Sequence, residues 1–251
     1  MRKIILNIFT KANEVLADRA FLLNSRKFIT HDLLGAVKDL LIPFLITFII
    51  FSILTARIQI GTDYALRNMP SMLADGAAWA YSISQAFGFS ALIWAWLSIA
   101  FGLTVSTKFW RGNKFLRIYT ETLHRRIGIN LIVLTIFHAV FLIWSAMGDT
   151  LLTVFIPFNY SDHERKLYVA FGVFSFYGMI ATSLIFYFRK KLGRRVWIFS
   201  HRFLAPIVYI LGVWHTIAYG SDSFLYGTVS LVIIIFQVPL LILLSKRLFS
   251  L

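Results

Sequence analysis

Long apolar stretches recur along this chain, and charged residues rarely interrupt them. A helix needs about 20 mostly apolar residues to cross the hydrocarbon core of a membrane. Six stretches meet that requirement, approximately residues 39–57, 82–107, 120–147, 167–188, 196–219 and 222–245. Helices satisfy their own backbone hydrogen bonds in lipid, whereas a barrel would need short alternating strands that the sequence lacks. The pattern therefore predicts an all-α integral membrane protein built as a six-transmembrane-helix bundle.

The composition supports this fold class. Hydrophobic residues make up 59% of the 251 residues, charged residues only 14%, and the mean hydropathy is +0.76. These values differ strongly from those of ordinary soluble domains. The chain has no cysteine, which excludes disulfides and thiolate metal sites.

Lysine and arginine indicate the orientation, because they are enriched on the cytoplasmic side of membrane proteins. If both termini are cytoplasmic, 21 of the 25 basic residues lie on that side. The other side holds four basic residues and six of the eleven acidic ones. The net charge of +14 thus reflects orientation and contact with anionic lipid head groups, and nucleic-acid binding is not expected.

Residues 1–38 precede the first predicted span, and we interpret them as a cytoplasmic, amphipathic segment that lies on the membrane surface. Ile5, Phe9, Ala12 and Leu16 fall on one helical face. The apolar core of this segment is too short for a signal peptide, and no small-residue cleavage site follows it. A role in docking a partner is the alternative to a plain anchor. Residues 39–251 form the predicted transmembrane domain.

Four of the six histidines fall within the predicted spans, where ionisable side chains are costly and usually functional. His124 and His138 share the third span, His201 and His215 share the fifth, and both pairs are 14 residues apart. Fourteen residues are close to four helical turns, so the two histidines of a helix face the same way, about 21 Å apart. Both spans run in the same direction. Facing helices would therefore present one His–His couple near each leaflet.

Such couples favour haem, because a porphyrin between two helices needs a neutral imidazole from each side along the iron axis. Zinc is a poorer interpretation, since it requires ligands that converge at one point. Interhelical hydrogen bonds are the usual role of a lone membrane histidine, but they do not explain two equally spaced pairs. A proton relay stays open, although acidic partners are missing from the interior of the spans.

Two segments resemble the ferric reductase-like transmembrane domain family, which includes ferric reductases, NADPH oxidases and the haem subunit of the bacterial methionine sulfoxide reductase system. They are "HRRIGINLIVLTIFH" and "RKKLGRRVWIFSHRFLAPIVYILGVWH". The resemblance implies two b haems that pass electrons across the membrane. It implies that His124 and His201 bind the inner haem iron and that His138 and His215 bind the outer one.

Differences in haem ligands and in domain content among the members of this family narrow the expected function. In the sulfoxide-reductase subunit, the position that matches His124 typically resembles an arginine. The histidine at this position here therefore favours two bis-histidine haems. Full ferric reductases and NADPH oxidases also carry a flavin and nicotinamide domain, and this sequence has no glycine-rich dinucleotide fingerprint. We therefore expect an oxidoreductase electron-transfer subunit that depends on a partner for any flavin or quinone.

The expected electron donor is a cytoplasmic flavoprotein reductase or a quinol, and the expected acceptor is an extracytoplasmic redox partner or metal. The expected location is the inner or plasma membrane. Two alternatives stay open. One is the haem subunit of a periplasmic protein-methionine-sulfoxide reductase system, and the other is a haem-free membrane transporter or assembly protein.

Several neighbouring residues are further candidates, most of them at the inner haem. Arg125 and Arg202 could bind its anionic propionates, although both also fit the ordinary excess of basic residues on the cytoplasmic side. Gly128 and Gly212 lie one turn from a ligand and could let the macrocycle approach the backbone, or could serve helix packing. The remaining histidines, His31 and His163, lie outside the spans and are not assigned to haem.

Overall fold

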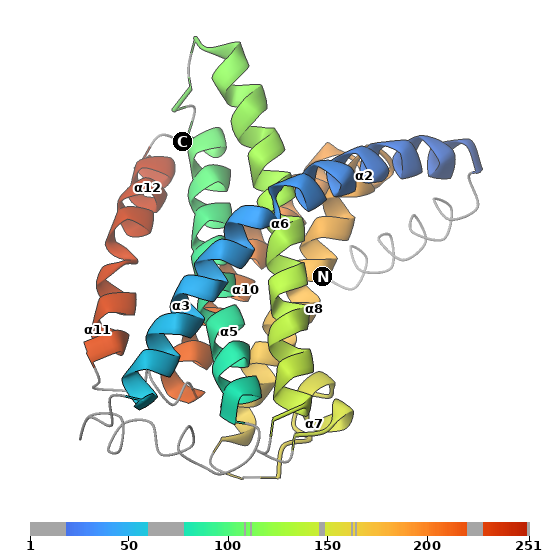
Figure 1. The fold of residues 1–251 in the computed structure, drawn as a ribbon. Coiled ribbons are helices and arrows are strands. Elements are labelled where there is room, and N and C mark those ends of the chain that lie inside the picture. Colours follow the sequence, from blue (N-terminus) through green and yellow to red (C-terminus); the bar gives the residue numbers. More distant parts are fainter. Residues whose placement is uncertain are drawn as a thin grey trace.

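A computed structural model of the chain is entirely helical in its regular structure within the residues it describes (Figure 1). The described residues are 19–59, 78–107, 109–110, 112–145, 149–161, 163, 165–219 and 228–249. The predicted amphipathic face of Ile5, Phe9, Ala12 and Leu16 lies outside them.

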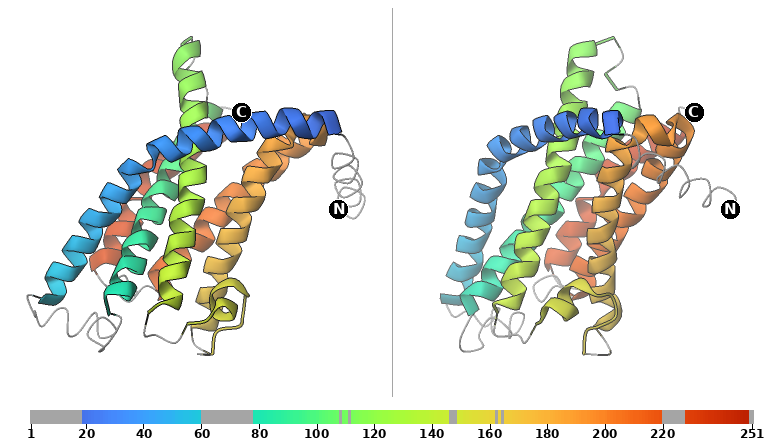
Figure 2. Two further views of the ribbon diagram at one scale, coloured as in Figure 1. Left: turned by 45° about the vertical axis from the view of Figure 1, so that its right-hand side comes forward. Right: turned by 90° about the vertical axis from the view of Figure 1, so that its right-hand side faces the viewer.

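Long helices run side by side as a bundle (Figures 1 and 2). They are α3 (Leu41–Gln59), α5 (Ala78–Ser106), α6 (Lys114–Ile143), α8 (Lys166–Tyr187) and α10 (Arg194–Tyr219), with α11 (Thr228–Ile235) and α12 (Val238–Phe249) as a broken last helix. Short helices α7 (Leu151–Phe155) and α9 (Arg189–Leu192) flank α8. Among the described residues, five helical segments are long and apolar enough to cross a membrane, and a sixth is added if α2 and α3 count as one bent span. The predicted all-α, multi-pass membrane fold is confirmed.

The first span is bent where α2 (Arg19–Asp39) meets α3, and the two helices differ in direction by 40°. Pro43 explains the position of the bend, because a proline has no N–H to donate to the carbonyl four residues earlier, at Asp39. The chain continues through Leu40, whose carbonyl accepts the N–H of Phe44 at 3.1 Å. As a result, α2 leaves the direction of the bundle and crosses its basic end (Figure 2). We use "basic end" for the end where α5, α6 and α8 meet residues 107–117 and 187–195.

The last span is interrupted at Phe236 and Gln237, between α11 and α12. Pro239 removes the N–H that would pair with the Ile235 carbonyl. Neighbouring side chains bind polar groups at the break, as a membrane interior requires. Trp96 Nε1 donates to the Phe236 carbonyl at 2.8 Å, and the Tyr209 hydroxyl donates to Gln237 Oε1 at 2.5 Å.

Two helix pairs form most of the bundle: α5 packs on α6, and α8 packs on α10. The α5–α6 interface contains the buried apolar cluster Phe87, Ala91, Trp94, Leu131 and Leu134. Small residues bring the second pair together. At Gly178 of α8 a Cβ atom would overlap the Val208 side chain of α10, and Ser175 Oγ donates to the Val208 carbonyl at 2.9 Å.

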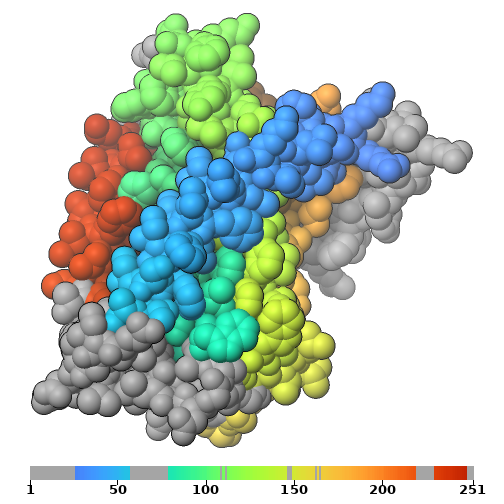
Figure 3. Space-filling view, viewed as in Figure 1, coloured from blue at the N-terminus to red at the C-terminus, as the bar shows by residue number. Residues whose placement is uncertain are grey.

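The segment α2 is bound to α6 by two ion pairs of different burial. The space-filling view shows α2 lying directly against α6 at the basic end (Figure 3). The Asp32 side chain is fully buried and accepts from Arg125 Nε at 2.9 Å and from the Tyr187 hydroxyl at 3.2 Å. Asp39 and Arg126 form the second pair at 3.3 Å, with side chains 37% and 27% exposed. We therefore expect the buried Asp32–Arg125 pair to stabilise the attachment of α2 far more than the exposed Asp39–Arg126 pair.

Asp32→Asn should destabilise the protein by about 3–5 kcal/mol, because it leaves the Arg125 guanidinium buried without its counter-charge. Asp39→Asn is the matched control on the same helix, and its exposed pair should contribute about 1 kcal/mol or less. Equilibrium unfolding in mixed detergent micelles measures both. Equal effects of the two substitutions would contradict the assignment of Asp32 as the main attachment of α2.

Candidate functional site

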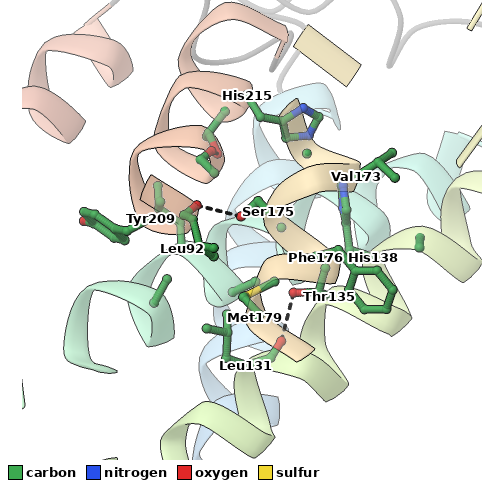
Figure 4. Close-up of a pocket in the computed structure, with 18 of the residues that line it drawn as sticks. Leu92, Leu131, Thr135, His138, Val173, Ser175, Phe176, Met179, Tyr209 and His215 are labelled. Atoms are coloured by element: carbon green, nitrogen blue, oxygen red, sulfur yellow. Dashed lines mark hydrogen bonds between the residues drawn. The ribbon is translucent and has the colours of Figure 1, made fainter. Parts of the chain in front are cut away.

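A single cavity of about 280 Å³ brings together the four histidines of the spans. Its walls are α5, α6, α8 and α10, and most of its lining is apolar. His124 and His138 enter it from α6, and His201 and His215 enter it from α10. Figure 4 shows part of this lining, with His138 and His215 above Leu131 and Met179.

The histidines meet as two couples, one at each level of the cavity. The ring centroids of His124 and His201 are 6.0 Å apart, and those of His138 and His215 are 6.5 Å apart. The rings of each couple are steeply inclined, at 89° and 77°. Because α6 is one uninterrupted helix, its two histidines are about 21 Å apart along the axis.

Three of the four imidazoles are fixed by the same contact to a neighbouring helix. His124 Nδ1 donates to the Ser98 carbonyl, His138 Nδ1 to the Ser84 carbonyl, and His215 Nδ1 to the Tyr168 carbonyl, each at 2.8 Å. A carbonyl can only accept, so Nδ1 carries the proton in each case. The lone pair of each ring is thereby left on Nε2, the atom that a metal would bind.

A glycine lies one helical turn beyond each of these carbonyls, directly against the ring. A Cβ atom would lie 3.1 Å from His138 Nδ1 at Gly88, 3.3 Å from His124 Cε1 at Gly102, and 2.8 Å from His215 Nδ1 at Gly172. We call each combination of carbonyl and glycine a seat. The three seats are Ser84/Gly88 and Ser98/Gly102 on α5 and Tyr168/Gly172 on α8.

A repeated sequence motif marks the seats, and the histidine positions alone do not reveal it. Residues 84–88 are SQAFG and residues 98–102 are SIAFG, so S-x-A-F-G occurs twice on α5 with the same 14-residue spacing as the histidines. Residues 168–172 are YVAFG and repeat the last three positions on α8. The 14-residue repeat on α5 would have identified Gly88 and Gly102, and the shared A-F-G on α8 would have pointed to Gly172.

His201 differs from the other three histidines. Its buried Nδ1 makes no well-formed hydrogen bond with the described residues, although the Thr182 backbone lies near it. Thr182 lies 14 residues after Tyr168, where the pattern of α8 would place a fourth seat. The residue one turn further is Phe186, so the position that holds glycine elsewhere is bulky here.

Comparison with known families gives a match to the description "ferric reductase like transmembrane component" over residues 87–213. That range covers half of the chain. The protein belongs to the ferric reductase-like transmembrane family. The match includes His124, His138 and His201, and His215 lies two residues beyond it. No curated protein and no solved structure matches the chain.

The two arginines predicted beside this ferric reductase-like site are in different surroundings. Arg125 lines the cavity, and it is also the partner of buried Asp32. Arg202 is exposed and lines a separate surface groove with Arg194 and Arg195. The structure thus brings Arg125 to the cavity and leaves Arg202 outside it.

The two glycines predicted near the ligands also differ. Gly128 lines the cavity, and a Cβ atom there would meet nothing within 4 Å. Gly212 also lines the cavity, but its Cβ direction meets Ser175 Oγ at 3.0 Å. Gly128 therefore keeps open space on the cavity side of α6, whereas Gly212 serves the packing of α10 on α8.

The end of the cavity opposite the basic end contains an acidic group. Asp149 lines it, accepts from Thr153 Oγ1 at 3.4 Å, and has its pKa raised by burial. His31 and His163 do not line the cavity. Within the described ranges, no group of three or more histidine, aspartate or glutamate side chains could hold a metal ion. The histidines are thus arranged as couples and not as a cluster.

Proposed function

We propose that this protein carries electrons across a membrane through two b haems, held by His124 with His201 and by His138 with His215. The observation that carries the proposal is the meeting of the histidines as two couples in one apolar cavity. Membership of the ferric reductase-like family supports transmembrane electron transfer independently of this geometry.

The spacing of the couples fits a metal ion between two imidazoles. Imidazole–metal bonds are about 2 Å long and a ring centroid lies about 1.2 Å behind its nitrogen, so two axial rings have centroids about 6.4 Å apart. The observed values of 6.0 and 6.5 Å agree with this expectation. The open space at Gly128 leaves room beside the His124 couple.

A bound haem would supply a centre that accepts and releases one electron, and the chain supplies its setting. The Nδ1 hydrogen bonds of three imidazoles fix their tautomer and orientation, so that Nε2 faces the cavity. Leu131, Met179 and Tyr209 line the cavity between the two levels. Mostly apolar walls exclude water from both couples. Arg125 is the arginine that we propose to face an anionic propionate, because it reaches the cavity.

The proposed electron donor acts at the basic end, where His124 and His201 lie, and is a flavoprotein reductase or a quinol. The proposed acceptor acts at the opposite end, near His138, His215 and Asp149. Two stacked couples between these ends provide the route, and no oxidation of a nicotinamide is assigned to this chain.

Detergent-purified protein from haem-supplemented cells should contain two b haems per chain with low-spin, six-coordinate visible spectra. His124→Ala or His201→Ala should each remove one haem and leave the other, because each breaks only one couple. A pyridine haemochrome assay counts the haems. His31→Ala and His163→Ala are the controls and should retain both. A wild-type preparation that stays haem-free would refute the proposal, and equal loss from all four substitutions would indicate misfolding.

Vesicles that contain the purified protein and entrapped ferricyanide should show ferricyanide bleaching after dithionite is added outside. His124→Ala and His215→Ala should each reduce the rate to that of protein-free vesicles, because the route needs both couples. His163→Ala should retain the wild-type rate. Bleaching that persists unchanged in both ligand variants would exclude a route through the two couples.

A further inference from the structure

The three seats are alike in geometry although they hold different histidines. In each, a helix carbonyl receives an imidazole Nδ1–H at 2.8 Å, and the residue four positions later is glycine. That carbonyl is also the normal acceptor for the N–H of the glycine. An oxygen with two lone pairs can accept both bonds, so the seat costs the helix no backbone hydrogen bond.

Glycine has an unfavourable helix propensity, which makes its repeated presence at this position informative. Alanine would be a better helix former at each site, yet its methyl group would press against the ring. The contact would be closest at Gly172, at 2.8 Å, and less close at Gly88, at 3.1 Å. Space for the ring is therefore the physical reason for glycine.

We infer that Gly88, Gly102 and Gly172 are positioning residues for the imidazoles, and that the absence of a fourth seat at Phe186 leaves His201 the least constrained of the four. This inference rests on the proposed function, because it concerns how the proposed iron ligands are held. It makes the two sites unequal. The outer couple has two seated imidazoles, and the inner couple has one.

The surroundings of His201 differ from those of a seated histidine. Phe186 occupies the seat position, and its ring lies 3.9 Å from the Arg189 guanidinium and 6.4 Å from the Trp197 ring. His201 itself contacts Trp197, with ring centroids 6.5 Å apart. Trp197 thus packs against the imidazole but gives its Nδ1 no hydrogen-bond acceptor.

Gly172→Ala should displace the His215 ring and break its bond to Tyr168, so that one of two haems is lost or becomes high-spin. Gly178→Ala is the matched control, because it lies on the same helix and its methyl group would meet Val208 instead of an imidazole. It should lower thermal stability and leave the haem spectrum and count unchanged. Gly88→Ala should act on the same outer haem less severely.

Haem content, low-spin electron paramagnetic resonance signals and thermal stability separate the possible results. If wild-type protein holds two haems and Gly172→Ala has the same spectrum and haem count as Gly178→Ala, the seat inference is wrong while the proposed function stands. If the wild type binds no haem, the proposed function itself fails. Should Gly172→Ala fail to accumulate, the Gly88→Ala protein decides between the same outcomes.

The missing seat is tested with carbon monoxide, which competes for a weakly held ligand position on reduced haem. Phe186→Gly places a glycine four positions after Thr182, as in the three seats. It should slow carbon monoxide binding, because the His201 Nδ1–H can then bond to the Thr182 carbonyl as in a seat. Phe186→Ala is the matched control, since it also removes the ring but keeps the Cβ atom that blocks a seat. It should bind carbon monoxide at least as fast as the wild type. Equal rates of carbon monoxide binding in the two variants would overturn the assignment of His201 as the least constrained ligand. The same conclusion would follow if neither the variants nor the wild type bound carbon monoxide.

Discussion

One hydrogen bond, from an imidazole Nδ1–H to a helix carbonyl, determines the orientation of three of the four histidines. In lipid a backbone carbonyl cannot be left without a partner, and here each carbonyl keeps its helical bond while it receives a second donor. The ring must come very close to the neighbouring helix for this to happen. Glycine permits that approach, and the closeness of α5 to α6 and of α8 to α10 follows from the same small residues.

The sequence predicted the long apolar helices and the equal spacing of the histidines, because hydropathy and helical periodicity are local properties. The predicted span at 167–188 and the observed α8, Lys166–Tyr187, differ by one residue at each end. The seats were not predicted, since a carbonyl acceptor leaves no side-chain signature at Ser84, Ser98 or Tyr168. Only the repeated glycine, with its 14-residue spacing on α5, could have indicated them.

The role of α2 could not be derived from the sequence. Residues 1–38 resembled a surface segment, yet Asp32 is fully buried against Arg125, which lies 93 positions along the chain. No local pattern connects two residues at that separation. The pairing also qualifies the role of Arg125. Asp32 engages Nε and Nη2, at 2.9 and 3.4 Å, so a further N–H group of the same guanidinium can still serve an anion in the cavity.

The two levels of the cavity differ because of α8 and α10, and not because of α5 and α6. Helix α5 offers equal seats at both levels, so the two histidines of α6 keep a fixed separation on an unbroken helix. Helix α10 has one seated histidine, one unseated histidine, and Pro206 between them, which removes the helical bond to the Arg202 carbonyl. Among the four histidines, His201 can therefore change its position most easily, because its half of α10 has no seat and is followed by Pro206. That half faces the basic end, where the proposed electron donor would approach.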